Sequence, residues 1–190
     1  MLNTETTCMQ TTTKNVKRAC PHTPGVRLRV LPTSGLLLLS LLLLLPTAAW
    51  GQFEFVTNNG AITITAYTGP GGQVAIPGSI NDLPVTTIGD YAFAGADIIT
   101  GVTIPNSVTS IGEGSFSDCI YLTCVTIPNS VISIGYGAFY DCLSLATVTN
   151  GAGVATVGGL AFAWDFSLTG VYFLGNAPSL GGRPRFLRRV

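Results

Sequence analysis

The chain has 190 residues, of which 47% are hydrophobic and only 9% charged, and its formal net charge is zero. This length allows one ordinary domain plus a targeting segment. All nine basic residues lie in the first 29 or last 8 positions, and the one histidine is His22. Because residues 52–182 hold eight acidic and no basic side chains, the body lacks the basic footprint of a nucleic-acid-binding domain.

A basic and then strongly apolar segment begins the chain. Residues 36–45 read LLLLSLLLLL, follow five basic residues and precede small ones. This order is typical of a secretory signal peptide with a long n-region, which we assign to residues 1–51. Cleavage is expected before Gln52 or, alternatively, after Ala49. The apolar run is shorter than the roughly 20 residues of a membrane span, and an uncleaved N-terminal anchor is the alternative.

Residues 52–71 predict a β-hairpin. Phe53 and Phe55 alternate with polar residues, as do Ile62 and Ile64, on the two sides of Asn58-Asn59-Gly60. Asn-Gly between alternating apolar runs favours a tight hairpin turn. We expect this hairpin to cap the structure that follows and to cover its exposed strand edge.

Residues 72–178 repeat with a period of 23 residues in about four units. The units 101–123, 124–146 and 147–169 follow one another without a gap, a unit with an insertion precedes them, and a partial unit starts at residue 170. Five kinds of position recur in register: Phe93, Phe116, Phe139, Phe162; Gly89, Gly112, Gly135, Gly158; Val85, Val108, Val131, Val154; Ile88, Ile111, Ile134, Val157; and Ile99, Leu122, Leu145, Leu168.

These periodic positions predict a repeat solenoid, mostly β. One short coil cannot bury its own apolar side chains, whereas stacked coils place Phe above Phe. Successive strands are then expected to pair in parallel about 4.8 Å apart. We expect strands in runs such as 125–127 and 131–134, short helical or 3-10 turns around each Phe, and a positive φ at the Gly of each Ile-Gly pair.

The repeat pattern, Leu-x-x-Val-x-Ile-Pro-x-x-Val-x-x-Ile-Gly-x-x-Ala-Phe-x-x-Cys, resembles the BspA-type leucine-rich repeat of bacterial surface proteins. Leu122, Val125 and Ile127 stand at the three apolar positions of its strand motif. The unit 147–169 departs from the pattern, because Asn150-Gly151 replaces Ile-Pro and Asp165 replaces the Cys. The resemblance implies a leucine-rich-repeat-like parallel stack with an extracellular or cell-surface interaction role and no catalytic residues.

Residues 179–190 form an irregular basic tail that ends in GGRPRFLRRV and matches nothing upstream. We interpret it either as a loose tail or as a truncated or frame-shifted end. Both interpretations leave the last coil poorly covered, so self-association through the C-terminal coil is expected.

The cysteines and two of the aspartates recur with the repeat. Cys119 and Cys142 are one repeat apart, and with Cys124 we interpret them as small apolar core residues in preference to a disulfide. Three Cys without His make a poor zinc site. Asp118 and Asp141 are interpreted as solvated loop carboxylates in preference to Ca²⁺ ligands. We expect no metal and no cofactor.

The outward strand positions are the candidate interaction surface. Hydroxyl ladders suit an extended peptide or glycan, although Thr also simply suits a solvated strand. The candidates are Thr103, Thr126, Thr149 and Tyr172 in one ladder, and Ser110, Ser133 and Thr156 in another.

The functional hypothesis is a secreted or cell-surface module for protein or glycan interaction or adhesion. A Ser-His-Asp or Cys-His arrangement is impossible in residues 52–182, which contain no His, so no enzyme activity is expected. The expected ligand of this module is an unknown protein or glycan and not nucleic acid. Membrane contact is expected only through an uncleaved export segment. The alternative is a fragment of a longer structural repeat array without independent function.

Overall fold

The computed structural model describes residues 49–181. The apolar run 36–45 and the residues 182–190 of the basic tail lie outside the described residues. Within the described part, one 3-10 helix, η3 (Ala49–Gln52), precedes thirteen strands. This part contains no helix with the length and apolar character needed to cross a membrane.

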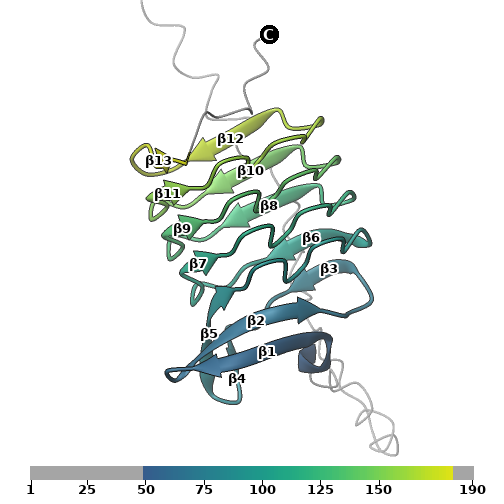
Figure 1. The fold of residues 1–190 in the computed structure, drawn as a ribbon, viewed down its shortest axis with the longest axis vertical. Coiled ribbons are helices and arrows are strands. Elements are labelled where there is room, and N and C mark those ends of the chain that lie inside the picture. Colours follow the sequence, from purple (N-terminus) through teal and green to yellow (C-terminus); the bar gives the residue numbers. More distant parts are fainter. Residues whose placement is uncertain (1–48, 182–190) are drawn as a thin grey trace, which may run out of the picture.

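The strands form a stack of coils with two sheets (Figure 1). The eight-stranded sheet has the order β1-β2-β5-β7-β9-β11-β13, with β4 pairing to β5, and the five-stranded sheet has the order β12-β10-β8-β6-β3. The bounds are β1 Phe53–Asn58, β2 Ala61–Tyr67, β3 Gly72–Ala75, β4 Ser79–Ile80, β5 Leu83–Ile88, β6 Ile99–Thr103, β7 Ser110–Ile111, β8 Cys124–Ile127, β9 Ser133–Ile134, β10 Thr147–Asn150, β11 Thr156–Val157, β12 Gly170–Phe173 and β13 Ser179–Leu180.

Strands of successive coils pair in parallel, and residues 23 positions apart face each other. In the five-stranded sheet, Thr103 pairs with Thr126 and Thr126 with Thr149. Val125 and Ile127 are buried while Thr126 between them is exposed, as the alternation of side chains along a strand requires. The predicted parallel solenoid is therefore confirmed.

A column of aromatic rings fills the core. Stacked rings join Phe93 to Phe116, Phe116 to Phe139 and Phe139 to Phe162, with centroids 4.8, 5.2 and 5.5 Å apart. These spacings approach the strand spacing of about 4.8 Å. The same coil-to-coil step therefore satisfies both the backbone hydrogen bonds and the ring stacking.

The segments around each Phe are turns. Single hydrogen bonds of the 3-10 kind occur, from Ser117 N to Gly114 O and from Tyr140 N to Gly137 O, but they do not continue into a helix. Most other amides of these turns donate to the next coil, as Phe116 N does to Ala138 O at 2.8 Å. Coil-to-coil bonding therefore replaces intrahelical bonding.

The prediction of a positive φ at each Ile-Gly glycine is wrong. Gly89, Gly112, Gly135 and Gly158 are absent from the left-handed residues of the described chain. A Cβ on Gly112 would instead lie 2.7 Å from Asp90 N, and one on Gly135 would lie 2.6 Å from Glu113 N. Glycine is required at these positions because the backbones of neighbouring coils approach too closely for any side chain.

The N-terminal hairpin of β1 and β2 forms as expected. The strands pair antiparallel, and Asn59 and Gly60 have φ of 50° and 76°, the signature of a two-residue I′ turn. Strand β2 then pairs in parallel with β5 of the first coil. The hairpin thus covers one edge strand of the eight-stranded sheet, and Phe53 and Tyr67 extend the aromatic column toward Phe93.

Truncation of the ring column tests the packing. Phe139 is fully buried, and we expect Phe139→Ala to lower the free energy of unfolding by about 3–5 kcal/mol. Denaturant unfolding followed by circular dichroism measures this. The control is Phe166→Ala, since Phe166 is 74% exposed and its loss should change stability by less than about 0.5 kcal/mol. Equal effects of the two substitutions would contradict the packing account.

Candidate functional site

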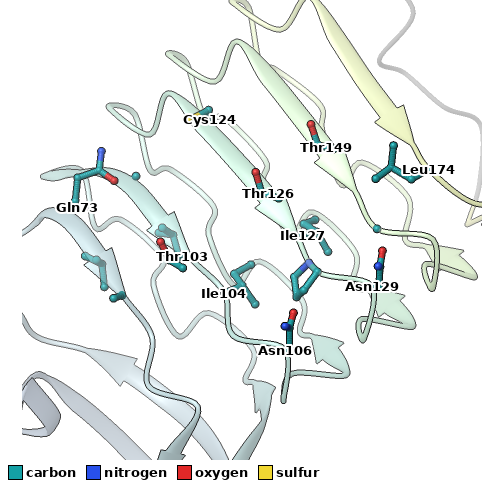
Figure 2. Close-up of a pocket in the computed structure, with 16 residues that line it drawn as sticks. Gln73, Thr103, Ile104, Asn106, Cys124, Thr126, Ile127, Asn129, Thr149 and Leu174 are labelled. Atoms are coloured by element: carbon teal, nitrogen blue, oxygen red, sulfur yellow. The ribbon is translucent and has the colours of Figure 1, made fainter. Parts of the chain in front are cut away.

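A groove of about 730 Å³ lies on the outer face of the five-stranded sheet (Figure 2). Strands β3, β6, β8 and β10 and the loops that follow them line it. Its central row is Thr103, Thr126 and Thr149, whose side chains stand on the sheet face in Figure 2. The structure thus brings three of the predicted surface residues together in one concave site.

The row of Thr residues continues to Tyr172, which pairs with Thr149. Tyr172 is 47% exposed and is not among the groove-lining residues. A Cβ on Gly170 would lie 2.8 Å from the Tyr172 phenol oxygen, so the ring folds back over Gly170. Tyr172 therefore extends the ladder on β12 without lining the groove.

The predicted ladder of Ser110, Ser133 and Thr156 lies on the other sheet. These residues belong to β7, β9 and β11, and Ser110 Oγ and Ser133 Oγ are 3.1 Å apart. Both serines are partly buried, while Thr156 is exposed. The seven candidates therefore occupy two separate faces, and the serines already hydrogen-bond each other.

Sequence reasoning missed the amide groups of the groove. Gln73 lines one end, where its side chain covers Gly101. Asn106 and Asn129 line the side where the strands end (Figure 2), and Asn129 Oδ1 accepts a hydrogen bond from Ala152 N at 2.8 Å. The recurring Pro-Asn-Ser at 105–107 and 128–130 was the signal for them in the sequence.

The core interpretation holds for two of the three cysteines. Cys119 and Cys142 are free and fully buried, and their thiols donate to Phe93 O and Phe116 O. Burial raises the pKa of Cys119 to about 12 and also raises the pKa of Cys142. Both thiols therefore stay protonated at neutral pH. Cys124 instead begins β8, is partly exposed and lines the groove, so the core interpretation is wrong for it.

Asp118 and Asp141 recur for a conformational reason. Both have a φ of 58°, and the equivalent Gly95 and Trp164 have φ of 67° and 69°. Asp is among the residues that tolerate this left-handed conformation best after Gly. Residues 49–181 contain no group of three His, Cys, Asp or Glu arranged to hold a metal ion.

Asp165 takes the place of the buried Cys in the unit 147–169. Its Oδ1 accepts a hydrogen bond from Cys142 N at 2.8 Å, but its buried Oδ2 has no hydrogen-bond partner among residues 49–181. Burial raises the pKa of Asp165 to about 8, against an ordinary value of 3.8, and this outweighs the hydrogen bond from Cys142, which lowers it. The protonated acid thus fits the slot better than the carboxylate does.

A parallel solenoid of short coils, with Leu-x-x-Val-x-Ile leading into the strands of one sheet, defines a leucine-rich repeat protein. The family model described as BspA type Leucine rich repeat region (6 copies) matches residues 85–183. The chain belongs to this BspA-type family.

One solved structure supports this family assignment, and a second is a more distant match. A leucine-rich repeat protein from Bacteroides capillosus is 35% identical with a TM-score of 0.61, over 66% of this chain and 96% of that one. A Leucine Rich Repeat protein from T. pallidum is 22% identical with a TM-score of 0.46, over 69% of this chain and 84% of that one. Comparison with curated proteins finds no match.

Titration of the partly buried Asp165 carboxyl group makes the free energy of unfolding depend on pH. The folded pKa of about 8 exceeds the ordinary 3.8, so the folded state binds one more proton between these values. The stabilisation is complete below pH 3.8 and is lost as pH rises through 8, at up to about 1.4 kcal/mol of unfolding free energy for each pH unit between these values.

Asp165→Asn should abolish this loss between pH 5 and pH 9, since an amide keeps the acceptor for Cys142 N without a titrating group. Denaturant unfolding at each pH measures it, with Asp82→Asn, an exposed turn residue, as the matched control. A wild-type pH profile in the Asp165→Asn variant would contradict the assignment.

Proposed function

We propose that this chain is a secreted or cell-surface interaction module that binds an extended polypeptide or glycan in the groove of the five-stranded sheet. The observation that carries the proposal is the groove itself, about 730 Å³ in volume, with a central row of hydroxyls flanked by amides. Hydroxyl and amide groups both donate and accept hydrogen bonds. They therefore suit the polar backbone of a peptide or the hydroxyls of a sugar chain.

The spacing of the row favours a ligand that itself repeats. Thr103, Thr126 and Thr149 stand on neighbouring parallel strands, which places their hydroxyls about 4.8 Å apart. Each belongs to a strand held by hydrogen bonds to its neighbours in the sheet. Groups fixed on paired strands lose little freedom on binding, so such a row is preorganised.

The chemistry of the body supports a non-catalytic role. Residues 52–182 contain no Lys, Arg or His, which leaves no nitrogen base for nucleophilic catalysis. The two buried thiols stay protonated and are not nucleophiles. Binding is the activity that these side chains can perform.

Export is supported by the start of the chain. The basic residues, the apolar run 36–45 and the small residues after it have the order of a signal peptide. The BspA-type resemblance implies an extracellular or surface-exposed protein. We therefore place the proposed binding outside the cytoplasm.

A bulky substitution in the central row tests the proposal. Thr126→Arg fills the middle of the groove, and we expect it to weaken binding at least tenfold, equivalent to about 1.4 kcal/mol. Binding of the purified protein to immobilised matrix proteins, peptides and glycans is measured by biolayer interferometry. The matched control is Thr156→Arg, an exposed Thr on the other sheet, which should bind as wild type.

Two results would contradict this proposal. One is a folded wild-type protein that binds nothing on the whole panel. The other is an equal loss of binding in Thr126→Arg and Thr156→Arg, which would move the binding face away from the groove.

A further inference from the structure

A second cleft, of about 340 Å³, lies on the turns around the Phe residues. It shares no lining residue with the groove of the five-stranded sheet. Tyr91, Tyr136 and Tyr140 line it together with the carboxylates of Glu113 and Asp118. The inference drawn from it goes beyond the proposed function and does not rest on it.

The cleft arises from a break in a ladder of left-handed residues. Tyr91, Gly114, Gly137 and Leu160 follow one another on successive coils with φ of 56°, 51°, 57° and 59°. Amides of this ladder donate to the next coil, as Gly114 N does to Tyr136 O and Gly137 N to Gly159 O. The two middle members lack side chains, so a hollow opens between the side chains of Tyr91 and Leu160.

Tyr91 is held in place despite its strained backbone. A left-handed non-glycine residue costs roughly 1–2 kcal/mol. The Tyr91 hydroxyl donates to Glu113 Oε1 at 2.6 Å, and a Cβ on Gly114 would lie 2.6 Å from Tyr91 Cδ1. The ring therefore lies against Gly114, where a larger residue would displace it.

The electrostatics of the cleft favour a cation. Its two charged residues, Glu113 and Asp118, are acidic, and residues 52–182 carry eight acidic and no basic side chains. The protein thus offers the cleft no positive charge of its own from this region. Tyrosine faces attract cations, and a summed negative field raises the local concentration of cationic ligands. A neutral sugar could pack against the tyrosine rings but would gain no attraction to the carboxylates.

We propose that this cleft binds a basic side chain of a partner polypeptide, arginine in preference to lysine. A guanidinium is planar, stacks on aromatic rings and pairs with carboxylates through two N–H groups, whereas an ammonium is a compact and strongly hydrated charge. The volume of about 340 Å³ lies at the small end of ligand pockets, which suits one side-chain head group.

Ring resonances of the full chain, labelled at tyrosine, report binding by NMR. The probe is the blocked peptide Gly-Ser-Arg-Ser-Gly, and its comparisons carry citrulline or lysine in place of arginine. We expect saturable shifts of the Tyr91 and Tyr136 signals with the arginine peptide, at least tenfold weaker binding of the neutral citrulline peptide and weaker binding of lysine. Methylguanidinium alone should bind at least threefold more weakly than the arginine peptide.

Two substitutions locate the site. Gly137→Asn should abolish the saturable shifts, because Asn tolerates the left-handed backbone and a Cβ there meets only Tyr140 Cβ at 3.5 Å. The matched control is Gly95→Asn, which has the same kind of backbone, φ 67°, in open space outside the cleft. Glu113→Gln keeps an acceptor for the Tyr91 hydroxyl and should weaken binding several-fold, a test that survives if Gly137→Asn fails to fold.

Four results would overturn the inference. Equal affinity for the arginine and citrulline peptides would remove the role of charge, and shifts that persist in folded Gly137→Asn would place binding elsewhere. Saturable shifts with a neutral disaccharide but not with the arginine peptide would make the cleft a sugar site. Equal affinity of methylguanidinium and the peptide would make it a site for free cations.

Discussion

The distance between neighbouring coils constrains the packing of the whole structure. Parallel strands must lie about 4.8 Å apart to exchange hydrogen bonds, and stacked rings from Phe93 to Phe162 keep centroid distances of 4.8 to 5.5 Å. Each buried position must therefore hold a residue that packs against its own copy in the coils on either side. The glycines of the Ile-Gly pairs obey the same step, because a Cβ on Gly135 would clash with Glu113 N.

Function is expected where this constraint relaxes. Outward-facing side chains do not pack in the core against the equivalent residue of the next coil. The residue type at these positions can therefore change from coil to coil. The row Thr103, Thr126 and Thr149 keeps one chemistry and forms the groove. The left-handed ladder instead changes from Tyr91 to two glycines and then to Leu160, and this change opens the second cleft. One regular scaffold thus carries a repetitive polar surface and a local aromatic one.

The sequence predicted the stack well because periodicity is a direct record of it. The ladders of Phe, Val and Ile, the parallel pairing and the Asn-Gly hairpin all follow from residue spacing alone. The positive φ at Ile-Gly was wrong, since a recurring Gly looks the same whether it turns the chain or lets backbones approach. The split of the Thr and Ser ladders between two sheets depends on where the coil bends, which spacing does not record. The second cleft stayed hidden because the residues of its ladder differ.

The fold is a one-dimensional stack of equivalent coils. Its most direct test compares two deletions in circular dichroism-monitored unfolding: residues 124–146, one whole coil, and residues 124–135, about half a coil. A stack predicts that the whole-coil deletion keeps the β spectrum and a cooperative transition at lower stability, because Thr123 then meets Thr147 in the same register. The half-coil deletion should lose the transition. Unfolding of both variants, or equal folding of both, would contradict the account.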